Sequence, residues 1–189
     1  VDLDLSHQMM TDQELICLSS VLHEDCGRVA VTLNLSYNDI GFRGANALGL
    51  ALSEHTQLQS LNLSVNHLAD GAQDLGPFLS VRHLDLAANK ISVLERLPLM
   101  PNLDSLMLDC NPIPRLSPAI TNQLQSLRKL SMCGTLMNNL YMTCRVLQDL
   151  PRLEHLYFQR SAQEVCFLPA DLPRSSTFAA AHWAALRPP

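Results

Sequence analysis

One template recurs four times along this 189-residue chain, and it restricts the possible folds more than any other feature. It consists of a leucine or substitute, two free residues, leucine, one free residue, leucine, two free residues, asparagine, one free residue and an aliphatic residue. The copies are Ala30, Leu33, Leu35, Asn38, Ile40; Leu58, Leu61, Leu63, Asn66, Leu68; Val81, Leu84, Leu86, Asn89, Ile91; and Leu103, Leu106, Leu108, Asn111, Ile113. A repeating unit of about 20 to 30 residues predicts a stacked solenoid rather than a globule with a pocket.

The template asparagines are spaced by 28, 23 and 22 residues, and degenerate copies flank the four clear ones. The flanking copies are centred on Leu3 and Leu5; on Leu127, Leu130 and Met132; and on Leu153, Leu156 and Phe158. Gln8, Thr135 and Ser161 take the asparagine position in them. We therefore predict about seven strands, with weaker repeats at the ends of the array, where one side of a repeat faces solvent.

The alternation of leucine with a free residue predicts a short strand with one buried face in each repeat. Successive strands stack about 4.8 Å apart as a parallel sheet. The asparagine follows each strand, where the chain turns, and its amide can donate and accept hydrogen bonds at once. We expect a structural ladder of Asn38, Asn66, Asn89 and Asn111 that satisfies buried backbone groups.

The segments between strands change character along the chain. A capping box at Thr11–Glu14 predicts a helix with Leu15, Leu18 and Leu22 on one face, and the segment from Gly44 to Leu52 is also predicted to be helical. Glycine and proline shorten or break the helical segments within 69–80 and 92–102. An apolar turn is expected at 120–124, and helix returns at 138–149. Because helices are wider than extended segments, the strand side should be concave.

These residues resemble the leucine-rich repeat family over residues 1–168. The first two repeats are similar to the long ribonuclease-inhibitor type, and the middle repeats to the short phosphatase-regulatory type. The resemblance implies an α/β solenoid with a curved parallel sheet on the concave face and helices or short helical turns on the convex face. It also implies that the concave sheet recognises proteins. Residues 169–189 depart from the pattern and are predicted to form a linker and a short C-terminal helix or tail.

Composition limits the partners and the compartment. The net charge of −5, with 13 basic and 18 acidic residues, argues against a nucleic-acid partner. No apolar run is long enough to cross a membrane. The six cysteines form no CxxC pair, so we expect reduced thiols and a cytoplasmic protein, with the nucleus or cilium as variants. The chain begins in strand pattern at Val1, which suggests a fragment of a longer protein or complex.

Outward-facing positions of the predicted strands form three columns, which become less uniformly small and polar toward the C-terminal half. Exposed methionine and tyrosine are typical anchors of protein interfaces. We therefore predict a protein-binding site on the concave face formed by Asp85, Met107, Asp109, Lys129, Cys133, His155 and Tyr157. The alternative is that these residues simply cover a solvated sheet.

The sequence does not favour catalysis, metal binding or glycosylation. His83 and Asp85 lie near Ser60 or Ser105, but an open strand face offers no oxyanion donors. Cys110 and Cys133 could approach each other, yet no pattern supplies the four ligands of zinc. Two glycosylation sequons, at Asn34 and Asn62, follow from the repeat itself. We predict no catalytic residue, metal or cofactor.

The sequence thus predicts a non-catalytic scaffold or adaptor, inside the cell, that binds a protein of unknown identity. Two alternatives stay open. One is an extracellular receptor or adhesion fragment, which would need disulfide caps and usable glycan sites. The other is a regulatory repeat domain of a larger enzyme.

Overall fold

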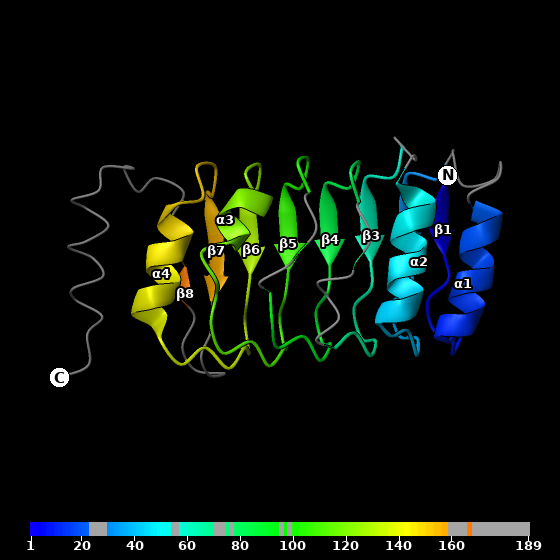
Figure 1. Cartoon of the computed structure of the whole chain (residues 1–189), viewed down its shortest axis with the longest axis horizontal. Coiled ribbons are helices and arrows are strands. Elements are labelled where there is room, and N and C mark those ends of the chain that lie inside the picture. The colour runs from blue at the N-terminus through cyan, green and yellow to red at the C-terminus, as the bar shows by residue number, and fades with distance from the viewer. Residues whose placement is uncertain are drawn as a thin grey trace.

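The computed structural model describes residues 1–22, 30–53, 57–69, 75, 78–94, 97, 100–158 and 166–167. Within these ranges, eight strands form one sheet in chain order (Figure 1). The strands are β1 (Asp2–Asp4), β2 (Thr32–Asn34), β3 (Ser60–Asn62), β4 (His83–Asp85), β5 (Ser105–Met107), β6 (Lys129–Ser131), β7 (His155–Phe158) and β8 (Cys166–Phe167). The first seven are parallel, as the repeat pattern predicted.

The register of the parallel strands is set by the middle leucine of each repeat. Neighbouring strands place these leucines directly opposite one another, in the series Leu3, Leu33, Leu61, Leu84, Leu106, Leu130 and Leu156. All but Leu3 are buried. A shift by one residue would turn every leucine to solvent, so hydrophobic burial fixes the pairing of the whole sheet.

The sheet does not end with another repeat. β8 pairs antiparallel to β7, with Tyr157 opposite Phe167 and Phe158 opposite Cys166. The leucine template did not predict this strand. The predicted C-terminal helix and tail, and the predicted boundary after residue 168, lie outside the described residues.

Four helices lie on one face of the sheet in the described part of the chain: α1 (Asp12–Val21), α2 (Phe42–Leu52), α3 (Ile120–Gln123) and α4 (Leu140–Gln148) (Figure 1). The Thr11–Glu14 capping box predicted from sequence starts α1, where the Glu14 carboxylate accepts from the Thr11 backbone N–H at 2.7 Å. The described residues of 92–102 form no helix, as the prolines predicted. Most of the return segment 69–80 lies outside the described residues.

The ladder asparagines form hydrogen bonds with backbone groups of the turns, as the repeat pattern predicted. The side-chain amide of Asn66 donates to the backbone carbonyls of Leu35 (3.0 Å), Leu63 (3.1 Å) and Ser64 (3.1 Å). Its Oδ1 accepts from the backbone N–H of Ile40 at 3.0 Å. Each such asparagine therefore joins its own turn to the preceding repeat. Asn38, Asn89 and Asn111 make equivalent bonds.

The asparagine ladder ends after Asn111, because Thr135 takes the asparagine position in the next repeat. Thr135 is buried in the asparagine position, and its hydroxyl donates only to Met132 of its own repeat among the bonds described (2.9 Å). The next repeat has no asparagine to accept from the N–H of Ile113. This N–H donates instead to the carbonyl of Asn111 (2.8 Å). A shorter side chain thus ends the connection between repeats without leaving this buried N–H unsatisfied.

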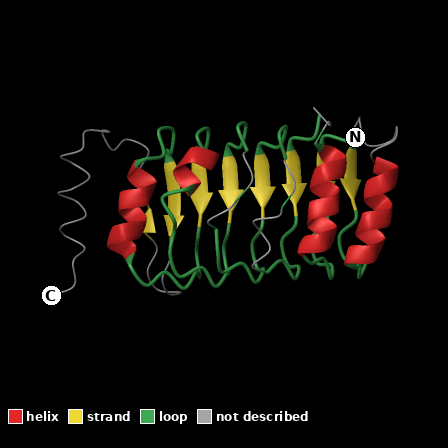
Figure 2. Ribbon diagram, viewed as in Figure 1, coloured by secondary structure: helices red, strands yellow, loops and turns green. Residues whose placement is uncertain are grey.

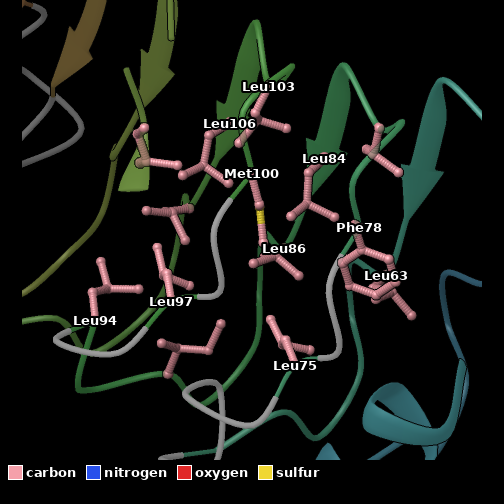
Figure 3. Packing of buried hydrophobic residues seen from close by; sticks show 14 of the residues in the cluster. Leu63, Leu75, Phe78, Leu84, Leu86, Leu94, Leu97, Met100, Leu103 and Leu106 are labelled. Atoms are coloured by element: carbon pink, nitrogen blue, oxygen red, sulfur yellow. The ribbon is translucent and has the colours of Figure 1, made fainter. Parts of the chain in front are cut away.

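A single hydrophobic cluster runs along the array between the sheet and its helical side (Figure 3). The strand leucines form one wall of this cluster. Opposite them, α1 and α2 contribute Leu15, Ala45 and Leu48, whereas the described residues of the middle repeats contribute Phe78, Leu94, Leu97 and Met100. The described residues of return segments with and without a described helix therefore contribute to the same core.

The first two helices pack closely at the first turn of α2, where Gly44 and Ala45 are small and buried. Asp12 of α1 accepts hydrogen bonds from the backbone N–H groups of Gly41 (2.7 Å) and Gly44 (3.0 Å), so it caps the start of α2. A methyl group on Gly44 would lie 2.7 Å from Asp12 Oδ1 and 3.1 Å from Asp12 Cα. Gly44 is therefore a point of contact between repeats.

Gly44→Ala is expected to destabilise the protein by about 1–2 kcal/mol, measured by urea unfolding. Overpacking costs about 1–3 kcal/mol, and the better helix propensity of alanine returns up to about 1 kcal/mol of that. Adding Gly44→Ala to an Asp12→Ala background should cost less, because the clashing oxygen is gone. Equal costs in the two backgrounds would show that Asp12 does not limit the space at Gly44.

Candidate protein-binding face

The sheet has one face covered by the helices and one face without helices among the described residues (Figure 2). We call the second the open face. Alternate residues of each strand point to it, as the alternation of leucine and polar residues predicted. All seven predicted site residues lie on β4–β7 or directly after β5 and β6, so the structure brings them onto four adjacent strands.

Polar residues in the N-terminal half of the open face mainly serve the backbone. The last residues of β1–β4 accept a hydrogen bond from the backbone N–H two residues on: Asp4 from Ser6 (3.0 Å), Asn34 from Ser36 (3.1 Å), Asn62 from Ser64 (2.9 Å) and Asp85 from Ala87 (2.9 Å). Such turns are a usual role of Asp and Asn. The sequence signal for these turns is an Asp or Asn directly after the middle leucine of each of the first four repeats.

The pattern changes at β5, where Met107 is the last residue of the strand and takes the place of the Asp or Asn. Two residues later, Asp109 Oδ1 accepts hydrogen bonds from the Cys133 backbone N–H and the Ser131 hydroxyl, both at 2.6 Å. Asp109 therefore ties β5 to the turn after β6. Of the predicted site residues, Asp85 and Asp109 thus have structural roles as well as positions on the open face.

Met107 and Tyr157 are the exposed large side chains of this part of the sheet. They are 43% and 39% exposed, and both lie opposite the small residue Ser131 on the strand between them. Two strand spacings separate them by roughly 10 Å. We call the position over the small Ser131 side chain, between these two large side chains, the notch.

Charged groups surround the notch. Lys129 is exposed and lies opposite His155, which is half-buried, on the neighbouring strand. Burial raises the pKa of Asp85 above its usual value, and the nearby Asp109 carboxylate raises it further, despite the opposing hydrogen bond from Ala87. Two partly buried carboxylates that repel one another would gain from a cation placed beside them.

The surroundings of Cys133 favour the neutral thiol. Burial raises the pKa of its thiol above the usual value, and the Asp109 carboxylate adds to the increase. The thiolate, which is the nucleophile and the metal ligand, is therefore disfavoured at neutral pH. Ser105, considered above as a partner of His83 and Asp85, is buried. In the described ranges, three or more His, Cys, Asp or Glu residues are nowhere grouped to hold a metal ion.

The fold and the face define a leucine-rich-repeat solenoid. No protein-family model matches the chain. It is 32% identical over 119 residues to an adenylate cyclase of Schizosaccharomyces pombe, which covers 61% of this chain and 6% of the cyclase. The solved structure of an internalin from Listeria monocytogenes, a leucine-rich repeat protein, matches with a TM-score of 0.53 at 18% identity. That match covers 79% of this chain and 38% of the internalin.

The chain thus spans a small part of the cyclase and less than half of the internalin, and the internalin likeness concerns the fold alone. A search of the described helices for one long and apolar enough to cross a membrane found none.

Proposed function

We propose that this chain is a non-catalytic scaffold that binds a protein partner on the open face over β4–β7. The observation that carries the proposal is the pair Met107 and Tyr157, exposed on either side of Ser131 on a sheet held rigid by the leucine and asparagine ladders. A sheet whose backbone is already fixed needs little further ordering of its backbone when a partner binds. Large exposed apolar side chains are the usual anchors of interfaces.

The surrounding side chains give the partner its orientation. Lys129 and His155 lie at the start of β6 and β7, and Asp85 and Asp109 lie on the β4–β5 side of the notch. Charges at the rim of an interface mainly affect association rate and register. Cys133 contributes as a small neutral group rather than as a nucleophile.

Replacing Met107 and Tyr157 together with serine should abolish capture of the partner from native extract. Each anchor is expected to contribute about 2 kcal/mol, or roughly 30-fold in affinity. Immobilised protein and quantitative mass spectrometry of the captured proteins provide the measurement. The matched control is Tyr141→Ser with Met142→Ser, which removes exposed residues of the same types from α4 on the helical side. Loss of capture in the control alone would place the interface on the helical side.

The compartment of this scaffold is proposed to be intracellular, in the cytoplasm or in the nucleus or cilium. Cys17, Cys110 and Cys133 have free thiols, whereas Cys26 lies outside the described residues. Thiol titration of the denatured protein, kept under non-reducing conditions, should find six reactive thiols. A disulfide-capped ectodomain would give four or fewer.

The match to an adenylate cyclase favours a second candidate, a regulatory repeat segment of a larger enzyme. An antibody against this chain would show the size of the native polypeptide, and the immunoprecipitate can be assayed for cyclase activity. A larger polypeptide with cyclase activity supports this candidate. A native polypeptide of about the present length, without activity, rejects it.

A further inference from the structure

A groove of about 540 Å³ runs along the edge of the sheet toward which the strand arrows point in Figure 1. It lies over the turns that contain Asn38, Asn66 and Asn89. The residues before these asparagines line it, among them Tyr37 and Val65, and so do His67 and Lys90, which follow two of them. This groove is separate from the notch at Met107 and Tyr157.

The residues before the ladder positions have an unusual backbone. His7, Tyr37, Val65, Ala88, Cys110 and Gly134 all have positive φ, between 52° and 69°. The repeat turn requires this conformation, which glycine or asparagine adopts with less strain than other residues. Only the last of the six is a glycine. The turn by itself therefore does not explain the large side chains at the N-terminal end of the series.

Val65 and Tyr37 are the clearest departures. A β-branched residue at φ 53° is a true outlier, and Tyr37 has φ 56° while its side chain is 52% exposed. The Tyr37 ring stacks on the ring of His7, with centroids 4.2 Å apart and planes at 15°. An exposed ring stack beside a strained valine adds little to the core but forms a flat apolar surface in the groove. Strained residues of this kind cluster at functional sites.

The charges beside that surface indicate what it would bind. His67 and Lys90 are exposed in the groove, and His67 Nε2 lies 3.0 Å from a carboxylate oxygen of Asp39. Lys90 lies one repeat further along, on a chain whose net charge is −5. A carboxylate placed at Lys90 would avoid Asp39, and an apolar side chain would cover Tyr37 and Val65.

We propose that this groove is a second protein-binding site, which takes an extended acidic peptide segment that carries an aromatic side chain. Two repeat spacings separate Tyr37 from Ala88, about 10 Å, which an extended chain spans with about three residues. Side chains two positions apart point to the same side of an extended chain and lie about 7 Å from each other, so an aromatic and an acidic residue at this spacing would place a ring over Tyr37 and Val65 and a carboxylate near Lys90.

The test uses nitrogen-15-labelled protein and three capped hexapeptides with serine at every second position: Ser-Phe-Ser-Glu-Ser-Glu (the Glu–Phe peptide), Ser-Phe-Ser-Lys-Ser-Lys and Ser-Ser-Ser-Glu-Ser-Glu. The Glu–Phe peptide should shift the backbone amide signals of Tyr37, Val65 and Lys90 in the NMR spectrum, and the other two should bind at least about fivefold more weakly. The proposal is overturned if the three peptides bind equally, if none binds, or if the shifts map to β4–β7.

Two variants separate binding from folding. Val65→Asn should keep or raise the melting temperature, because asparagine tolerates positive φ, and should weaken binding of the Glu–Phe peptide. Val93→Asn, at another exposed valine without positive φ, is the control and should leave binding unchanged. Lys90→Glu should weaken binding about fivefold, whereas Lys129→Glu on the open face should not. A lower melting temperature for Val65→Asn would show that Val65 serves the fold and overturn the proposal.

Discussion

Asn66→Ala should lower the free energy of unfolding by about 4 kcal/mol, which is a large fraction of the stability of an ordinary domain. The substitution leaves the buried N–H of Ile40 without its described partner, which costs about 1–3 kcal/mol. It also removes three hydrogen bonds to the carbonyls of Leu35, Leu63 and Ser64, each contributing roughly 0.5–1.5 kcal/mol.

The damage should extend beyond one repeat, because neighbouring asparagines share acceptors. The carbonyl of Leu35 receives the side-chain amides of both Asn38 and Asn66, and the carbonyl of Leu63 receives those of Asn66 and Asn89. Bonds in such a chain polarise one another. Hydrogen exchange of the amide of Ile40 should therefore accelerate together with exchange at the turn of Asn66.

Ser64→Ala provides the control for Asn66→Ala. Ser64 lies two residues before Asn66, at the same turn. Its described bonds to Asn62, Tyr37 and Asn66 use its backbone N–H and carbonyl, which alanine keeps. We expect a loss below about 1 kcal/mol in urea unfolding. Equal losses for the two variants would mean that the asparagine ladder does not stabilise the array.

The ladder could be predicted because one side-chain type recurs at one position and only its hydrogen-bonding capacity explains the choice. The repeat pattern gave the strands, their register and the buried leucines for the same reason. It could not give β8, because an antiparallel strand of two residues carries no repeat signal. It also could not show that Ile113 would bond to Asn111 once the next asparagine was replaced by Thr135, since that bond depends on relaxed backbone geometry.

The candidate face was predictable in part. Alternation along the strands places Met107, Lys129, His155 and Tyr157 on the open face, whatever their function. The notch over Ser131 required the register between β5, β6 and β7, which pairs large and small side chains across strands. The groove at the turns escaped prediction because it depends on backbone dihedral angles. Nothing in the residue types of Tyr37 or Val65 indicates positive φ.

The return segments show how repeats of unequal length share one core. Repeats with a full helix fill the space behind the sheet with several small and medium side chains, such as Leu15, Ala45 and Leu48. The repeat that contains β3 reaches β4 through a segment in which the described residues Leu75 and Phe78 are buried in that cluster. Phe78 is among the largest fully buried side chains described. Its volume therefore fills a substantial part of the core at this level of the array.

Phe78→Ala is accordingly expected to destabilise the protein by about 4 kcal/mol, because it removes a buried ring and leaves a cavity in the cluster that also contains Leu63, Leu75 and Leu84 (Figure 3). Leu79→Ala is the control one residue away. Its side chain is 43% exposed, so its loss should be below about 0.5 kcal/mol. If urea unfolding finds equal losses of free energy for Phe78→Ala and Leu79→Ala, Phe78 does not fill core space at this level of the array. Phe78→Leu should recover most of the stability, since the cost of a buried substitution follows the volume that is left empty.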